Sequence, residues 1–366
     1  MRLAITTVIV PDPRYEGAAR RLQHITDLLR QRGVSVTLLP LHREFRTMDA
    51  GSISERIEQW RQHGLAIAET NWQANVQHHP YDIVWHDSYL AAEQSMGFIR
   101  EKCPGTRQVF DTVDLAHVRY FREAKVMRNQ RQLLRAMATK RSEIQLATQA
   151  DFTLAISQDE ARTLQQLAPQ ARILTVPNVH PRPLKTPGFT ARSGLAFIGS
   201  YHHTPNPDAV HWLCDELWPR CLELAPDLQL SIIGNGPLDD DKIALTPNMK
   251  RLGYVEDLAT CLQGLRITVA PLRFGAGIKG KVLESICHGA PVVGTEIAAE
   301  GLNMPPGAGI RVTHSAEDFA RAVVQLYHSQ AIWEQTIHQG IDVIDQHFTQ
   351  AAVGKELDSL LASLKN

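Results

Sequence analysis

The first half of the chain alternates short apolar runs with stretches whose apolar residues recur every three or four positions. The runs are rich in β-branched residues and predict buried strands at residues 3–10, 34–39, 82–85, 107–110, 152–156 and 173–176. The stretches with helical spacing lie at residues 17–32, 53–75, 115–148 and 158–167. Because strands and helices alternate, we expect a parallel sheet that is covered by helices.

A proline-rich segment interrupts this alternation, which then starts again. Residues 176–189 read VPNVHPRPLKTPGF and are typical of a linker. Further strands are predicted at residues 194–198, 228–233, 252–254, 267–270 and 291–294, with a helix near residues 207–224. We therefore expect an α/β chain of two Rossmann-like domains, 1–182 and 183–366, with parallel sheets facing across a cleft. Whether the last helix crosses back to the N-terminal domain is left open.

Composition excludes several classes of protein. Hydrophobic residues make up 43% of the chain and charged residues 21%, which is an ordinary globular mixture. The formal net charge of −1 argues against a nucleic-acid binder, which usually has a clearly basic domain. The five cysteines are scattered without a CxxC pair, as in a reducing cytoplasm.

The apolar run at the N-terminus is too short for a signal peptide, and no stretch is long enough to span a membrane. We therefore expect a soluble, cytoplasmic protein.

One glycine-rich turn carries an oddly placed lysine. Residues 273–284 read RFGAGIKGKVLE and lie between a predicted strand and a predicted helix. Lys279 precedes Val282 and Leu283 by three and four positions, so it lies on the inward row of this helix. A cation at a helix N-terminus is unfavourable, because that end already carries partial positive charge. A bound anion would resolve the conflict, and the alternative is a lysine whose ammonium extends to solvent.

Three further loops follow predicted strands of the second half. Gly199 and Ser200 open the first, and Gly234-Asn235-Gly236 form the second, where glycines allow a ligand to approach the backbone. Both loops also fit ordinary capping and tight turns. Glu284 lies one helical turn beyond Lys279. Its carboxylate is suited to accept hydrogen bonds from the hydroxyls of a ribose, and the alternative is an ordinary solvent-exposed glutamate. The last loop, residues 294–302, ends near the same edge of the sheet.

Polar residues also follow strands of the first half. Gly17 lies in the turn PDPRYEG at residues 11–17, where it allows the backbone to approach a diphosphate. Asp111, Asp114 and His117 follow the strand at residues 107–110. Helix capping is the simpler account of either aspartate.

A basic helix is predicted at residues 119–141. It is rich in arginine and lysine, and Phe121, Met127, Leu133, Leu134 and Met137 are interleaved with the cations. A solvated face is the usual explanation of such a charge run, whereas the apolar residues favour a peripheral contact with the inner face of an anionic membrane. Both interpretations stay open at this point.

Together these loops resemble the retaining glycosyltransferases of family 4, also called glycosyl transferases group 1, which have the GT-B fold. The matching segments are FIGSYHHTPNPDAV, LSIIGNGP, LGYVEDL and APLRFGAGIKGKVLESICHGAPVVGTEIAAEGL. They occur in the order found in the family and cover most of residues 194–302. The first half resembles the family more loosely, through PDPRYEG and FDTVDLAHVRYFREAK.

The resemblance implies a role for each matching position. The C-terminal domain would bind a UDP- or GDP-linked sugar, with Lys279 and Arg273 on the diphosphate and Glu284 on the ribose. Asp111 or His117 would orient the hydroxyl of a glycan or glycolipid acceptor. Gly17 would approach the diphosphate from the N-terminal domain. The remaining donor-binding positions are Gly199, Ser200, Gly234, Asn235, Gly236, Phe274, Gly275, Ala276, Gly277 and Ile278.

The chain departs from the family pattern at three places. Ala276 stands where many members have the first of two glutamates, and Ser200, His202 and His203 replace an arginine/lysine pair. Asp111 replaces a frequent histidine. The resemblance implies sugar transfer with retention and no cofactor. No metal site is implied, because the histidine pairs at residues 78–79 and 202–203 lack the spacing of metal ligands. A catalytically silent GT-B protein that binds nucleotide or a partner is the alternative. A nicotinamide dehydrogenase is disfavoured, because no GxGxxG follows the first strand.

Overall fold

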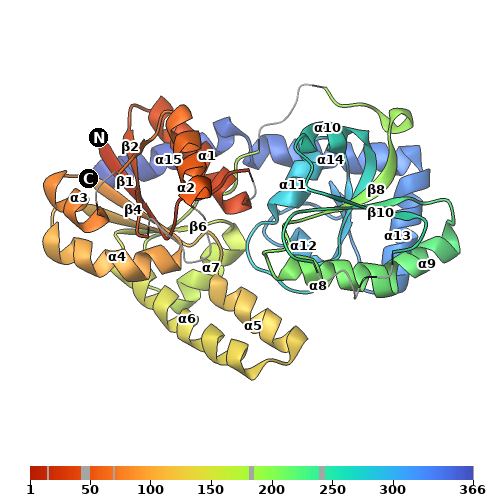
Figure 1. Ribbon diagram of the computed structural model, residues 1–366, viewed down its shortest axis with the longest axis horizontal. Helices are drawn as coiled ribbons and strands as arrows, with labels where there is room; N and C mark the ends of the chain where they lie inside the picture. Colours follow the sequence, from red (N-terminus) through yellow and green to blue (C-terminus); the bar gives the residue numbers. More distant parts are fainter. Residues whose placement is uncertain are drawn as a thin grey trace. The chain divides into compact units, whose positions relative to one another are not determined.

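The computed structural model describes residues 1–14, 16–42, 50–68, 71–180, 185–238, 243 and 245–365. The chain divides into two compact units by its internal contacts (Figure 1). Unit 1 comprises Met1–Phe121, Gln130–Val179 and Val353–Asn366, and unit 2 comprises Arg122–Asn129 and His180–Ala352. The boundary expected between residues 182 and 183 lies outside the described residues.

The core of unit 1 is a parallel sheet in the order β3-β2-β1-β4-β5-β6-β7. Its central strands are buried on both faces, as expected for a sheet with helices on either side. The order reverses between β1 and β4, because the chain adds strands first on one side of β1 and then on the other. The strands are β1 (Arg2–Thr7), β2 (Ser35–Pro40), β3 (Ala66–Ile67), β4 (Ile83–Asp87), β5 (Arg107–Asp111), β6 (Phe152–Ala155) and β7 (Ile173–Thr175).

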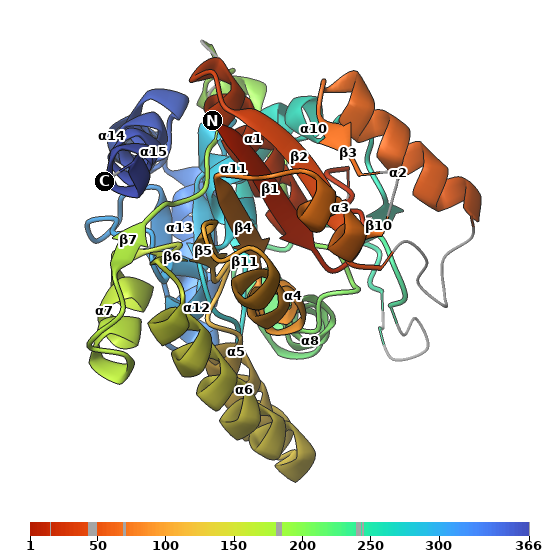
Figure 2. The ribbon, with the colours of Figure 1, turned by 90° about the vertical axis from the view of Figure 1, so that its left-hand side faces the viewer.

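Two helical layers cover this sheet. Leu3 and Ile5 of β1 pack with α1, α2 and the C-terminal helix α15, whereas Ala4 packs in the separate core on the other face. The helix α6 runs beside α4 on that side (Figures 1 and 2). The helices are α1 (Gly17–Gln31), α2 (Ala50–Gln62), α3 (Trp72–His78), α4 (Tyr89–Lys102), α5 (Ala116–Met127), α6 (Gln130–Gln149), α7 (Gln158–Leu167) and α15 (Gln350–Lys365).

Two helices predicted for the first half were too long. The helix expected at residues 53–75 ends in the structure at Gln62, and β3 and α3 follow it. Gly64 has a φ of +73°, which ends the helix in the left-handed conformation that glycine adopts readily. The basic helix expected at residues 119–141 is also two helices, since Arg128 has a φ of +50° between α5 and α6.

Unit 2 is built on a second parallel sheet, in the order β10-β9-β8-β11-β12-β13. The prediction of two Rossmann-like parallel sheets is therefore confirmed. The strands are β8 (Ser193–Ile198), β9 (Leu230–Ile233), β10 (Met249–Gly253), β11 (Leu265–Ala270), β12 (Val292–Gly294) and β13 (Ile310–Val312). The α-helices are α8 (Pro205–Trp212), α9 (Trp218–Leu224), α10 (Leu258–Gly264), α11 (Gly280–Cys287), α12 (Glu296–Ala299), α13 (Ala316–His328) and α14 (Gln330–His347).

Local irregularities in unit 2 were not foreseen. The single helix predicted near residues 207–224 is interrupted by a π-helical turn at Leu213–Leu217, which separates α8 from α9. The strand β13 was not predicted, because its three residues give too short an apolar pattern. None of the helices in the described ranges is long and apolar enough to cross a membrane.

Candidate functional site

The loops at the carboxyl edge of the second sheet converge on one place. The strand order reverses between β8 and β11, and ligands of open α/β sheets bind at such a reversal. The loop after β8 holds Gly199 and Ser200, and the loop after β11 holds residues 273–278. The loop after β9 holds residues 234–236. The fold thus brings most of the predicted donor-binding positions to this edge.

The glycine-rich turn places Lys279 at the start of α11. Gly275 has a φ of +154°, and a side chain added there would lie 3.3 Å from the Lys279 Cε atom. Lys279 is the N-cap residue of α11 and is only 8% exposed, so the predicted inward position is confirmed. Its Nζ donates to the Gly277 carbonyl at 2.6 Å and lies 3.1 Å from the Glu300 carboxylate. The protein itself therefore supplies a counter-charge that sequence reasoning did not identify.

Glu300 is shared between two cations of unit 2. Besides Lys279, the guanidinium of Arg122 donates to both carboxylate oxygens at 2.7 Å. Burial acts to raise the pKa of Glu300, but the hydrogen bond from Arg122 and the charges of Lys279 and Arg122 hold it below its usual value. The carboxylate is therefore ionised at neutral pH, and the group of three residues carries a net positive charge.

Arg273 is a partly exposed side chain whose charge is balanced by a buried carboxylate. Its Nε donates to the buried carboxylate of Asp208 on α8 at 2.9 Å, and a second bond makes the pair bidentate. The hydrogen bond to Asp208 is the main reason that the pKa of Arg273 is raised. Because this guanidinium already has a full counter-charge, its expected contact with a phosphate stays a prediction.

Glu284 lies on the second turn of α11 between two imidazoles. Its Oε2 is 3.1 Å from His180 Nδ1, and its Oε1 is 3.5 Å from His288 Nε2. The side chain is 26% exposed, so one part of the carboxylate remains accessible. The expected contact with a ribose stays a prediction, and the two histidines were not foreseen.

The glycines after β8 and β9 are needed for packing. A side chain at Gly234 would lie 2.0 Å from the carbonyl oxygen of Gly199, and one at Gly236 would meet the ring of His202. The Gly199 N–H donates to the Ile233 carbonyl at 3.0 Å. Close packing of the two loops therefore explains Gly199 and Gly234 without a ligand, and their donor-binding role stays a prediction.

Ser200 and Asn235 also hold these loops together. The Ser200 carbonyl accepts a hydrogen bond from the amide of Asn206 at 2.7 Å. The Asn235 carbonyl accepts one from the Tyr201 N–H at 2.7 Å. In the third loop, Phe274 and Ile278 are buried side chains, whereas Ala276 and its neighbour Gly277 line the turn before Lys279. All of these positions keep their predicted roles as untested expectations.

The predicted acceptor-side residues of unit 1 are deeply buried. Asp111 ends β5, is fully buried, and accepts from Arg21 Nη1 at 2.6 Å. His117 on α5 pairs with the buried carboxylate of Glu143, whose pKa is raised by burial despite the histidine. Gly17 begins α1, where an added side chain would meet no atom within 4 Å. The structure explains Asp111 and His117 as interior residues held by Arg21 and Glu143, and their contact with an acceptor stays a prediction.

Asp87 was missed by the sequence analysis. It ends β4, next to the strand reversal, and lies opposite Asp111 in the β4–β5 register. One of its buried carboxylate oxygens has no hydrogen-bond partner. Burial, and then the charge of Asp111, raise the pKa of Asp87 to about 7. The signal in the sequence was an aspartate two positions after the apolar run IVW at residues 83–85.

Comparison with known proteins finds a family that matches the part of unit 2 containing these loops. Residues 192–329, which contain the three loops of unit 2, match the family described as "Glycosyl transferases group 1". This part of the chain is therefore similar to the domain that defines the group 1 glycosyltransferases. An uncharacterized 44.6 kDa protein from the cps region of Klebsiella pneumoniae is 25% identical over 159 residues. That match covers 41% of this chain and spans 40% of the length of the relative.

Solved structures extend the likeness in fold to the whole chain. Anabaena Alr3699/HepE in complex with UDP and glucose superposes with a TM-score of 0.74 at 14% identity, covering 99% of this chain and 100% of that chain. Sucrose-phosphate synthase from Thermosynechococcus elongatus gives a TM-score of 0.72 at 13% identity and covers 99% and 98% of the two chains. The expected GT-B fold is therefore confirmed.

Proposed function

We propose that this protein is a retaining, metal-independent glycosyltransferase of family 4 that moves a sugar from a nucleotide-sugar donor to a hydroxyl group. The observation that carries the proposal is the inward Lys279 at the N-terminus of α11, within the group 1 domain and at the strand reversal of its sheet. A helix N-terminus and a buried ammonium together favour a diphosphate. Unit 2 would bind the donor, and unit 1 would present the acceptor.

The chemistry requires stabilisation of a leaving diphosphate. The bond between the sugar C1 and the phosphate oxygen breaks, and a bond from C1 to the acceptor oxygen forms on the same face. The acceptor proton passes to the departing phosphate. The helix N-terminus and Lys279 would stabilise the negative charge that develops on the leaving group. In unit 1, Asp87 and Asp111 are the carboxylates at the sheet edge that suit orientation of the acceptor hydroxyl.

The nucleotide of the donor and the class of acceptor are inferred from similar proteins. HepE was crystallised with UDP and glucose, which supports a UDP-linked donor, with GDP as the other nucleotide to test. The relative from a cps region supports a role in cell-surface polysaccharide or glycolipid synthesis. The acceptor would accordingly be a glycan or a glycolipid, and the enzyme would act in the cytoplasm.

We further propose a peripheral contact of the basic segment 119–141 with the inner membrane surface. On α6, the exposed fractions of Leu133, Leu134 and Met137 are 41%, 67% and 46%. Exposed Arg131 and Arg141 accompany them, and the acidic residue of this helix, Glu143, is buried. An apolar face with cations beside it is typical of helices that lie on anionic bilayers. The first half of α6 extends beyond α4 in both ribbon views (Figures 1 and 2).

Calorimetric titration with UDP, GDP and their sugars tests the donor proposal. We expect micromolar binding of one nucleotide and a loss of about 10- to 100-fold in Lys279→Ala, since hydrogen bonds to charged groups contribute this much. The exposed Lys250→Ala serves as the control. No binding to any of these compounds, or undiminished binding in Lys279→Ala, contradicts the proposal. The configuration of the product at C1, read by NMR, tests retention.

A catalytically silent nucleotide-binding protein is the second candidate. Ala276 stands where the family often has a glutamate, and Arg273 is already paired with Asp208. Donor hydrolysis discriminates the two functions. Tight binding of the nucleotide sugar without release of sugar, with water or with a panel of acceptors, would favour the silent protein.

A further inference from the structure

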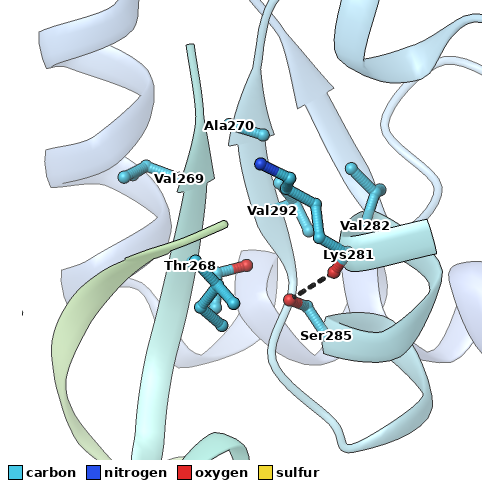
Figure 3. Close-up of a pocket in the computed structure, with 8 residues that line it drawn as sticks. Thr268, Val269, Ala270, Lys281, Val282, Ser285 and Val292 are labelled. Carbon is cyan, nitrogen blue, oxygen red and sulfur yellow. Dashed lines mark hydrogen bonds between the residues drawn. The ribbon is translucent and has the colours of Figure 1, made fainter. Parts of the chain in front are cut away.

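Lys281 occupies an unusual position for a lysine. It is the second residue of α11, and its side chain lines the gap between Ile198 of β8 and residues 268–270 of β11. Figure 3 shows the side chain extending from α11 toward Ala270, at the end of β11. The ammonium therefore lies at the strand reversal of the second sheet, where ligands of such sheets bind.

The contacts of this ammonium are neutral. Lys281 Nζ donates to Asn206 Oδ1 at 2.5 Å and lies 4.7 Å from the centre of the Phe197 ring. Among the described residues, no carboxylate forms an ion pair with Lys281. The neighbouring cations differ, because Lys279 is paired with Glu300 and Arg273 with Asp208.

This arrangement is unfavourable without a ligand. A half-buried cation costs free energy unless an anion compensates it, and the positive end of α11 adds to the cost. The conflict that the sequence indicated for Lys279 is eased by Glu300, which Lys279 shares with Arg122. Lys281, in contrast, has no acidic partner among the described residues.

The ammonium also lies beside the loop that follows β8. A side chain added at Gly199 would lie 2.8 Å from Lys281 Nζ. The Asn206 amide binds the Ser200 carbonyl through its nitrogen, so that its oxygen is directed to Lys281. This is the loop in which Ser200 and His202 stand in place of the arginine/lysine pair common in the resembling family.

We propose that Lys281 binds the diphosphate of the nucleotide donor from α11 and supplies the positive charge that the loop after β8 lacks. This inference rests on the proposed function. It adds a binding residue beyond Lys279, and it gives a role to a lysine that lies among Phe197, Asn206 and Gly199 without an acidic partner.

The protonation of Lys281 supports the same role. Burial, and then the charge of Lys279, lower the pKa of Lys281 to about 7. The other charged groups on the packed elements are Asp208 on α8, which is held by Arg273, and Glu284 on α11, which is held by two histidines. A diphosphate beside the ammonium would raise this pKa. Nucleotide binding should therefore take up a proton at pH 8, where the unbound amine is largely neutral.

Titration of UDP and GDP into the full-length protein at pH 8 tests the proposal. We expect Lys281→Met to weaken binding about 10- to 100-fold, since it removes a charged hydrogen bond. Lys281→Arg keeps the charge and should recover most of the affinity. The control is Lys250→Met, which removes an exposed lysine of unit 2. Circular dichroism and thermal melting establish that each variant is folded.

Two further readouts exclude a merely structural role. Titrations of the wild type in HEPES and in Tris report the protons exchanged, and we expect net uptake that is absent in Lys281→Arg. Without nucleotide, Lys281→Met should melt at a higher temperature than the wild type, because a half-buried amine with no acidic partner has been removed.

The outcomes separate this inference from the proposed function. Failure of the wild type to bind UDP or GDP overturns both. Binding by the wild type that is unchanged in Lys281→Met overturns the role of Lys281 alone. Equal weakness in Lys281→Met and Lys281→Arg assigns the loss to packing and also overturns that role. If the wild type takes up no proton when it binds nucleotide at pH 8, the role of Lys281 is overturned whatever the variants show.

Discussion

The ammonium of Lys279 lies 3.1 Å from the carboxylate of Glu300. A donor phosphate that binds Lys279 must therefore share this lysine with an internal anion. Glu300 also holds Arg122, so the carboxylate keeps two cations together when no nucleotide is present. This contact links the stability of unit 2 to the strength of its proposed anion site.

Glu300→Gln should tighten nucleotide binding. Removal of the carboxylate leaves two cations without their counter-charge, and we expect the Kd for UDP to fall about 3- to 10-fold at low salt. Titration at 50 and 300 mM NaCl measures the effect, which should shrink at high salt. The exposed Glu223→Gln is the control. Weaker binding in Glu300→Gln would instead show that Glu300 positions Lys279 for the phosphate.

The same variant should be less stable at neutral pH. The Glu300 side chain is 24% exposed, so we expect a loss of about 1–2 kcal/mol in the free energy of unfolding. Because the pKa of Glu300 is lowered in the folded protein, this stabilisation is present above the unfolded value of 4.5 and is lost as the pH falls through the folded pKa. Urea denaturation of both proteins at pH 7 and at a series of pH values below 4.5 measures the difference, which should shrink as the pH falls through the folded pKa.

Asp87→Asn should stabilise unit 1 at alkaline pH. The pKa of Asp87 is raised to about 7 by burial and by Asp111, while Arg21 acts against the shift. A raised carboxyl pKa favours the folded state at low pH, and that advantage is lost as the pH rises through 7. This loss begins above the unfolded value of 3.8 and is complete above 7, and the variant does not undergo it. Its Tm should therefore exceed that of the wild type by roughly 5 °C at pH 8 and by less at pH 5. Melting curves with the same Tm difference at both pH values would contradict the assignment.

His86 should make unit 1 sensitive to acid. The imidazole is fully buried and contacts Thr6, Ser95 and Gln108 at 2.9–3.0 Å. Burial lowers the pKa of His86 to about 4 from 6.5, so the folded state is destabilised as the pH falls from 6.5 toward 4. The shift corresponds to about 3 kcal/mol. Urea unfolding at pH 7 and pH 4.5 measures it, and His86→Gln should show a smaller loss over the same interval.

Leu134→Ser should weaken binding to anionic vesicles. Leu134 is 67% exposed on α6, and its removal from a bilayer surface would reduce the partition coefficient about 10-fold. Arg131→Gln and Arg141→Gln should each reduce it about 5-fold, since each cation near the surface contributes about 1 kcal/mol. Co-sedimentation with vesicles of phosphatidylcholine alone, or with 30% phosphatidylglycerol, measures these effects.

The matched control for the vesicle experiment is Leu224→Ser. Leu224 is a 54% exposed leucine at the end of α9 in unit 2, so its loss should leave vesicle binding unchanged. Equal effects of the two leucine variants, or binding that does not depend on the anionic lipid, would contradict a specific contact of α6.

The sequence by itself determined features that depend on near neighbours along the chain. The apolar runs predicted the central strands of both sheets, and the spacing of Lys279 to Val282 and Leu283 predicted its inward position, because helical periodicity is a local property. The same dependence on near neighbours explains why the predicted helices wrongly continued through residues 62–72 and 128–129. There the backbone conformation of Gly64 and Arg128 ended helices whose side-chain pattern continued.

The tertiary structure alone decided which charges are compensated. Glu300 is separated from Lys279 by 21 positions, Asp208 from Arg273 by 65, and Asn206 from Lys281 by 75. These partners meet because the order of β8, β11 and β12 brings their carboxyl ends to one edge, and no periodicity along the chain encodes that order. Sequence therefore indicated a cationic turn, whereas the fold gave acidic partners to Lys279 and Arg273 and none, among the described residues, to Lys281.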